Sequence, residues 1–136
     1  MRFGRPIIID TGVLISAAIR PQSVPATALE RALRHHEVYA CAETLSELEA
    51  VLMRSKFDRY ASIVQRQAFL QGLTEHLKMV VVKEPTQECT EPKDDKFLAL
   101  AWEVRAELIV ASDPHLTCMH PWRLIPILPP AAFLVM

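Results

Sequence analysis

The stretch that decides the fold is "IIIDTGVLISAAI", residues 7–19. Its three consecutive isoleucines indicate a short buried strand, and the apolar residues after Asp10 indicate a helix. The strand therefore ends in a carboxylate, where a helix N-cap can stand and where α/β proteins build ligand sites. Asp10 belongs to such a site only if other acids reach the same place.

Composition sets broad limits on what the chain can be. Its 136 residues, 51% of them hydrophobic, favour one domain over residues 1–136 with one dense core. A net charge of −1 does not by itself indicate a nucleic-acid partner. A nucleic-acid site on this protein would therefore need a local basic patch or a bound metal ion. No apolar run reaches the roughly 18 residues of a membrane helix, and the N-terminus lacks a signal-peptide pattern.

Cysteine usage points to a reducing compartment. Cys41, Cys89 and Cys118 form no CxxC pair. A zinc knuckle or a disulfide framework is therefore not expected, and reduced thiols suit a cytoplasmic protein.

Predicted strands and helices alternate along the chain. The strands are expected at residues 6–10, 37–41, 78–82, 107–112 and 123–128. This alternation is typical of a parallel sheet with helices on both faces. Pro126 lacks an N–H group, which predicts an edge position for the last strand.

The acids of interest lie at strand ends and helix starts. Asp10 ends the first strand, Asp113 ends the fourth, Asp94 and Asp95 open the helix between them, and Glu47 lies early in the helix after the second strand. In a βαβ sheet the carboxyl ends of strands and the N-termini of helices share one edge. The sequence therefore predicts that these acids converge.

Each acid also has a purely local explanation. Asp10 and Asp113 suit helix N-caps, and acids in a first turn are favoured by the helix dipole. Glu47 stands three residues after Thr44 in a capping-box pattern, and Glu49 flanks the same leucine stripe as Glu47 does. Spacing does not separate Glu47 from Glu49, and only nearness to the strand edge favours Glu47.

A convergent site made only of carboxylates calls for a hard cation. Several carboxylates within a few ångströms repel one another, so that some would stay protonated without one. Mg²⁺ and Mn²⁺ prefer oxygen ligands and can act on a phosphodiester. The absence of His and Cys from the set argues against zinc.

Four motifs in order resemble the PIN domain family, the nuclease fold of many bacterial toxin–antitoxin toxins. They are "IIIDTGVLISA", "TLSELEAVLMRSKF", "EPKDDKFLALA" and "LIVASDPHL", and the ending "HPW…IPIL…P…FL" over residues 120–134 matches as well. The resemblance implies a three-layer α/β/α sandwich with a central parallel sheet. It also implies Mg²⁺- or Mn²⁺-dependent cleavage of single-stranded RNA, and a cognate antitoxin as partner.

The resemblance also assigns residues. At two positions the chain departs from the family pattern: it has Gly12 where the family commonly has Asn, and Ser112 where the family commonly has Thr. Ser112 keeps a hydroxyl group and is an accessory candidate, as is Asp94. The implied catalytic and metal-binding residues are Asp10, Glu47, Asp95 and Asp113.

Basic side chains near these motifs are candidates for RNA contact. Arg54 and Lys56, with Arg59 beside them, follow the helix that carries Glu47, and Lys96 flanks the third acid. These cations either contact RNA phosphates or lie at a solvated helix end, where positive charge complements the helix dipole. The nearly uncharged tail "LIPILPPAAFLVM" predicts a homodimer, unless it packs on its own sheet.

Two functions follow as expectations. The first is a divalent-metal-dependent endoribonuclease that cleaves single-stranded RNA as the toxin of a toxin–antitoxin pair. The alternative is a catalytically weak PIN-like module that acts through a protein partner, which Gly12 favours. A haloacid-type phosphatase is not expected, because "DTG" at residues 10–12 lacks the second aspartate of its motif.

Overall fold

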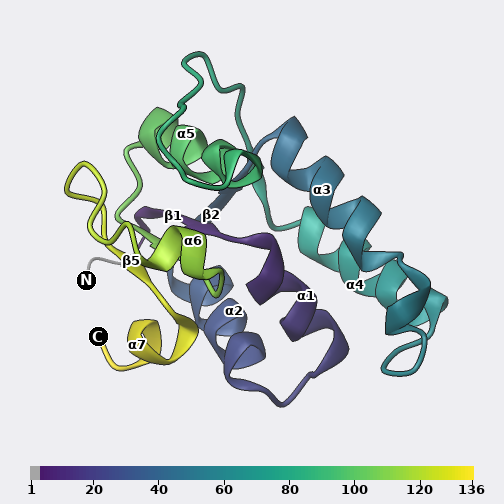
Figure 1. The fold of residues 1–136 in the computed structure, drawn as a ribbon. Helices are drawn as coiled ribbons and strands as arrows, with labels where there is room; N and C mark the ends of the chain where they lie inside the picture. The colour runs from purple at the N-terminus through teal and green to yellow at the C-terminus, as the bar shows by residue number, and fades with distance from the viewer. Residues whose placement is uncertain (1–3) are drawn as a thin grey trace.

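A computed structural model describes residues 4–136 and shows helices on both faces of a five-stranded sheet (Figure 1). Residues 1–3, which belong to the N-terminal stretch that lacks a signal-peptide pattern, lie outside the described residues. The elements, in chain order, are β1 (Pro6–Ile9), α1 (Thr11–Ile19), α2 (Val24–His35), β2 (Glu37–Ala40), α3 (Ala42–Leu52), the 3₁₀ turn η1 (Ser55–Phe57), α4 (Ile63–Thr74), β3 (Lys78–Met79), the 3₁₀ turn η2 (Pro92–Asp94), α5 (Asp95–Val104), β4 (Leu108–Val110), α6 (Pro114–Thr117), β5 (Ile127–Leu128) and α7 (Pro130–Leu134).

The sheet is parallel, with the strand order β3-β2-β1-β4-β5. The first strand is central because its three isoleucines are buried and can pack on both faces. The chain leaves β1 toward β2 on one side and reaches β4 on the other. The gap between these two connections, at the carboxyl end of β1, is where ligand sites form in such sheets.

Alternate residues of the strands face two separate cores. Ile7 and Ile9 pack with α1, α2, α3 and α7, whereas Ile8 and Ile109 pack with α5 and α6. The predicted three-layer α/β/α sandwich is therefore confirmed. None of the helices formed by residues 4–136 combines the length and apolar character that a membrane crossing requires.

The strand limits correct the sequence prediction at the edges. The strand expected over residues 78–82 pairs only at Lys78–Met79, and the one expected over residues 123–128 pairs only at Ile127–Leu128. Both are outer strands, which have a single neighbour to pair with and so end early. The edge position predicted from Pro126 is confirmed, since it precedes β5.

The C-terminal tail packs on its own chain. Ile125, Ile127 and Phe133 are buried, and Arg31 Nη1 donates a hydrogen bond to Leu134 O at 2.7 Å. The reason for expecting a dimer, a tail too apolar to bury alone, is therefore wrong for most of its length. The dimer itself stays a prediction.

Candidate acidic site

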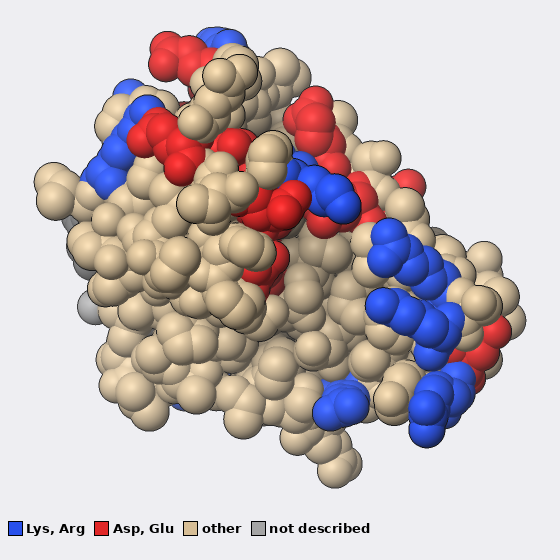
Figure 2. All heavy atoms as spheres, in the orientation of Figure 1, with Lys and Arg blue, Asp and Glu red and all other residues tan. Residues whose placement is uncertain are grey.

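A cleft of about 480 Å³ opens at the carboxyl edge of the sheet, where β1 and β4 end. Its polar lining comes from segments far apart in sequence, and Figure 2 shows acidic side chains gathered beside a hollow on this face. The acids that line it are Asp10, Glu47, Asp94 and Asp113.

Asp10 is the best-anchored of these acids. Its Oδ1 accepts a hydrogen bond from Val13 N at 2.9 Å, which makes it the N-cap of α1. Its Oδ2 accepts from the backbone amides of Ser112 at 2.9 Å and Asp113 at 3.2 Å. Burial raises the pKa of Asp10, and the three amides only partly offset that rise. Asp10 is thus both a helix cap and the residue that joins the ends of β1 and β4.

The two departures from the family pattern lie against each other. A Cβ atom added at Gly12 would stand 2.5 Å from the Ser112 hydroxyl oxygen, closer than side chains pack. The space that a larger residue would take at position 12 is therefore occupied by Ser112. Because residues 12 and 112 lie far apart in the chain, sequence analysis could not predict this contact.

Asp94 and Asp113 form a hydrogen-bonded pair of acids in the cleft. The pKa of Asp94 is raised to about 7, first by burial and then by a hydrogen bond to Asp113, the negative charge of Asp113 and that of Glu47, while Lys96 opposes the rise. Asp113 Oδ1 also accepts from His115 N at 2.9 Å, so Asp113 caps α6. Asp94 therefore keeps its proton up to near-neutral pH, because two carboxylates cannot both ionise cheaply this close together.

Glu47 is held by a cation. Its Oε2 lies 2.6 Å from Lys96 Nζ, and both side chains are mostly buried. Helix α3 begins at Ala42 with Cys41 as its N-cap, and Thr44 Oγ1 accepts from Cys41 N at 3.0 Å. The capping box expected between Thr44 and Glu47 is therefore wrong, and Glu47 is free of any capping role.

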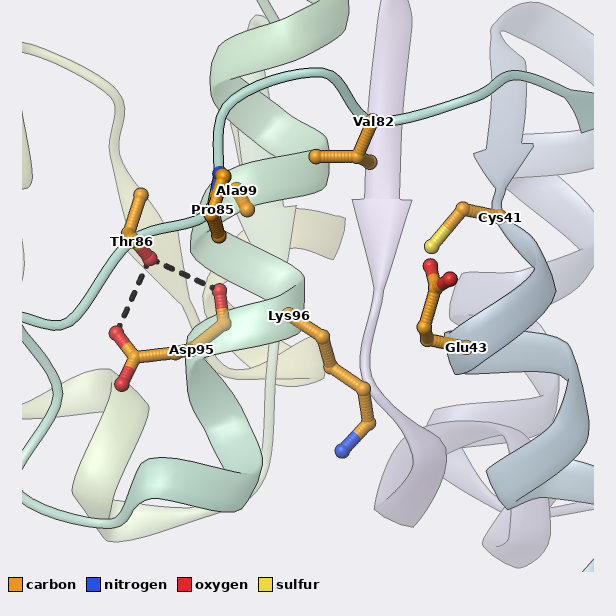
Figure 3. Close-up of a pocket in the computed structure, with 8 residues that line it drawn as sticks. All are labelled: Cys41, Glu43, Val82, Pro85, Thr86, Asp95, Lys96 and Ala99. Carbon is orange, nitrogen blue, oxygen red and sulfur yellow. Dashed lines mark hydrogen bonds between the residues drawn. The ribbon is translucent and has the colours of Figure 1, made fainter.

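Asp95 lies outside the cleft, which corrects its place in the predicted site. Its Oδ1 accepts from Thr86 Oγ1 at 3.1 Å and from the amides of Glu88 at 2.9 Å and Cys89 at 3.0 Å. Figure 3 shows Asp95 turned toward Thr86 and Lys96 reaching the other way, toward the start of α3. Successive residues point about 100° apart around a helix, so only one of two adjacent acids can face the cleft. That residue is Asp94.

A second hollow of about 360 Å³ lies on the Asp95 side of α5 (Figure 3). Its walls include Cys41, Val82, Pro85 and Ala99, and its polar side chains include Glu43. Lys96 lines this hollow and also reaches Glu47 of the acidic cleft. The Lys96 stem therefore separates the two spaces.

The basic candidates divide into two groups. Lys96 lines the neighbouring hollow and pairs with Glu47 at the border of the cleft. Arg54 and Lys56 lie between α3 and α4, on either side of Ser55, and both are exposed. Phe57, next to Lys56, lines the acidic cleft. Sequence reasoning did not single out Phe57, which carries no chemical signature.

The donor set of the cleft suits a hard divalent cation. Its polar side chains offer oxygen atoms only, from the carboxylates and from the hydroxyls of Thr11 and Ser112, and no donor group of the described residues reaches the buried Asp94 Oδ2. In the present side-chain arrangement, however, no three acidic, histidine or cysteine side chains among residues 4–136 surround one point as a metal site. The ion pair with Lys96 draws Glu47 away, so Glu47 would have to release Lys96 before it could share an ion with the others.

Comparisons with known proteins agree with this architecture. Residues 6–115 match the model of the PIN domain family. The chain is 29% identical over 118 residues to the uncharacterized protein MJ1680 of Methanocaldococcus jannaschii, covering 84% of this chain and 74% of that protein.

A solved structure shares the fold. The structure of VapBC2 from Rickettsia felis, bound to a DNA fragment from their promoter, superposes with a TM-score of 0.59 at 13% identity. The match covers 90% of this chain and 96% of that chain. At this identity the likeness concerns the fold alone.

Proposed function

This chain belongs to the PIN domain family, and we propose on that premise that it is a divalent-metal-dependent endoribonuclease acting on single-stranded RNA. The observation that carries the proposal is the convergence of Asp10, Glu47, Asp94 and Asp113 on one cleft at the carboxyl edge of the sheet. These acids come from four separate segments, and local capping explains only two of them.

Mg²⁺ or Mn²⁺ is the proposed cofactor, with Asp10, Asp94 and Asp113 as its first ligands and Glu47 as the fourth. Such an ion would supply a Lewis acid for the phosphodiester and lower the pKa of an attacking water. The raised pKa of Asp94 supports this choice, because a cation would relieve the crowding that now keeps a proton there.

The chain's own residues have distinct proposed tasks. The amides of Ser112 and Asp113 fix the direction of the Asp10 carboxylate. Asp94, titrating near neutral pH, can hold or release a proton at the cleft. Lys96 is a movable counter-ion of Glu47, able to pair with a phosphate oxygen once that acid turns away. Arg54 and Lys56 are proposed phosphate contacts beside the cleft.

A toxin role, with a protein antitoxin as partner, is part of the proposal. It rests on the family resemblance and on the shared fold with the VapBC2 structure. The gene next to this one tests it: a small DNA-binding protein encoded there, which co-purifies with the chain, is the expected partner.

The test of the enzyme is cleavage of a pool of single-stranded RNAs by the purified protein with Mn²⁺. We expect cleavage that EDTA and Asp94→Asn each abolish. Asp95→Asn is the matched control, since Asn keeps an oxygen for the loop amides and Asp95 lies outside the cleft. Undiminished cleavage in EDTA would reject the metal mechanism.

A second candidate is a non-catalytic module of the same fold that acts through a partner. The ion pair between Glu47 and Lys96 favours it, because an acid held by a lysine is a poor metal ligand. Failure to cleave any RNA, together with a melting temperature that Mn²⁺ does not shift, would favour this module over the enzyme.

A further inference from the structure

Four exposed cations near the end of α1 and between α3 and α4 have no acidic partner among the described residues. Arg20 ends α1, and Arg54, Lys56 and Arg59 lie between α3 and α4. Among residues 4–136 no carboxylate comes within ion-pair distance of any of them. Figure 2 shows Lys and Arg side chains across the hollow from the acids. A merely solvated helix end does not explain why cations from two separate segments meet at one place.

An aromatic ring stands among these cations. The guanidinium carbon of Arg20 lies 5.6 Å from the centre of the Tyr60 ring, and that of Arg59 lies 5.3 Å from it. Tyr60 is nevertheless 45% exposed. The Arg20, Arg59 and Tyr60 side chains, called the Tyr60 platform from here on, therefore offer positive charge and exposed aromatic surface together.

A buried arginine holds the segment that carries the platform. Arg66 of α4 is fully buried. It donates hydrogen bonds to the carbonyl oxygens of Leu52 at 2.8 Å, Arg54 at 3.2 Å and Ala61 at 3.0 Å, and it pairs with Asp58. The turn between α3 and α4 is thus fixed from inside. A fixed surface loses little conformational freedom when it binds a ligand.

The platform is continuous with the cleft. Phe57 and Val51 line the cleft, and Lys56 Nζ lies 5.1 Å from the centre of the Phe57 ring. Tyr60 N donates to Phe57 O at 3.0 Å. One short turn therefore presents Phe57 to the acids and Tyr60 to solvent.

We propose that the Tyr60 platform binds single-stranded nucleic acid, with one unpaired base stacked on the Tyr60 ring and the neighbouring phosphates on the cations. The inference rests on the proposed ribonuclease function and names the surface that would hold its single-stranded substrate. Exposed aromatic side chains beside cations are the usual means of binding single strands, because every base offers a face for stacking. A base inside a duplex is already stacked on its neighbours and gains nothing from the ring.

Binding of a labelled RNA in EDTA tests the platform without cleavage. The probe is a fluorescein-labelled single strand of about 12 nucleotides, within the range that one small binding site covers, read by fluorescence anisotropy beside a blunt duplex of the same sequence. Tyr60→Leu is expected to weaken single-strand binding at least about fivefold, the low end for one stacked base. Tyr60→Phe, which keeps the ring, is expected to bind as the wild type does.

Charge variants separate stacking from phosphate contact. Arg20→Gln with Arg59→Gln is expected to weaken both probes and to lower the salt dependence of binding. Arg105→Gln is the matched control: Arg105 lies 3.9 Å from the Trp102 ring centre, in the same kind of contact, but at the opposite end of α5 from Asp94. It is expected to change neither probe.

The outcomes distinguish this inference from the function on which it rests. Equal losses for single strand and duplex with Tyr60→Leu would overturn stacking, as would no loss or no binding by the wild type. If the RNA binds as expected but is not cleaved in Mn²⁺, the Tyr60 platform is supported and the nuclease function is refuted. If the wild type cleaves RNA but Tyr60→Leu binds it as the wild type does, the nuclease function is supported and the Tyr60 platform is refuted.

Discussion

Lys96 Nζ lies 2.6 Å from Glu47 Oε2, so one acid of the cleft already has a counter-ion at the border of the cleft. The lysine supplies part of the positive charge that a divalent cation would bring. A cation entering the cleft has to compete with it for Glu47.

Replacing this lysine separates its two effects. We expect Lys96→Met to lower the stability of the metal-free protein by up to about 1 kcal/mol, the scale of a partly exposed ion pair. The same variant is expected to gain more stability from Mn²⁺ than the wild type, since Glu47 is released. Thermal melts in EDTA and in Mn²⁺ measure both changes. Lys93→Met, an exposed neighbour outside any ion pair given by the structure, controls for loss of charge. A smaller Mn²⁺ shift for Lys96→Met than for Lys93→Met would contradict this role.

The pKa of Asp94 predicts a pH-dependent effect of its substitution. An acid whose folded-state pKa is raised from 3.8 to about 7 binds more protons folded than unfolded across that interval. Its contribution to stability therefore declines as pH rises from about 4 to about 7 and is constant above that. Asp94→Asn removes this loss. In EDTA the free energy of unfolding of Asp94→Asn should equal that of the wild type near pH 4 and exceed it by roughly 1–2 kcal/mol at pH 8. The gain is smaller than the full pKa shift would give, because Asp94 and Asp113 titrate as a coupled pair.

Urea unfolding of both proteins over this pH range is the measurement. Asp95→Asn removes a charge outside the cleft that accepts hydrogen bonds from the amides of Glu88 and Cys89, so we expect no comparable gain in the free energy of unfolding at high pH. An Asp94→Asn protein that is less stable than the wild type at pH 8 would show that Asp94 is not crowded by Asp113.

Asp95 has a structural task that a different substitution tests. Asp95→Ala leaves the exposed amide of Glu88 and the partly buried amide of Cys89 without their acceptor, at a cost of about 0.5–1.5 kcal/mol for each lost hydrogen bond. Asp95→Asn should lose much less. Thermal melts of the two variants, each with and without Mn²⁺, should show the same metal-induced shift as the wild type. If Mn²⁺ no longer raises the melting temperature of either variant, Asp95 is a metal ligand after all.

The contact between Gly12 and Ser112 predicts non-additive substitutions. Gly12→Ala favours the helix by up to about 1 kcal/mol but drives a Cβ against the Ser112 hydroxyl. We expect little net gain in the wild type and a clear gain of about 0.5–1 kcal/mol in the Ser112→Ala background, where the collision is absent. A double-mutant cycle by chemical unfolding gives the coupling energy. Additive effects would mean that the hydroxyl rotates away at no cost.

The sequence predicts the fold further than it predicts the site. Alternating apolar strands and helices suffice for a parallel sheet, because the burial of Ile7, Ile8 and Ile9 on both faces depends on residue type alone. Convergence of the acids follows from the same topology. The choice between Asp94 and Asp95 depends on how α5 is rotated about its axis, which packing of Phe97 and Leu98 on the sheet determines.

Two further features had no sequence signal. The pairing of Lys96 with Glu47 joins α5 to α3, and nothing in the spacing of either motif selects that partner. In the sequence Arg66 is one of several polar residues of its helix, yet it is fully buried and donates hydrogen bonds to three carbonyl groups. Both depend on contacts between distant segments, which periodicity cannot reveal.

The hydrogen bonds from Ser112 and Asp113 to Asp10 also bear on how the protein is made. They join residues 102 and 103 positions apart. During synthesis Asp10 leaves the ribosome long before Ser112 and Asp113 do. The cleft therefore cannot assemble on a nascent chain that stops short of these two residues. If the chain is the proposed ribonuclease, a ribosome translating it would not be exposed to its activity until residues 112 and 113 have emerged.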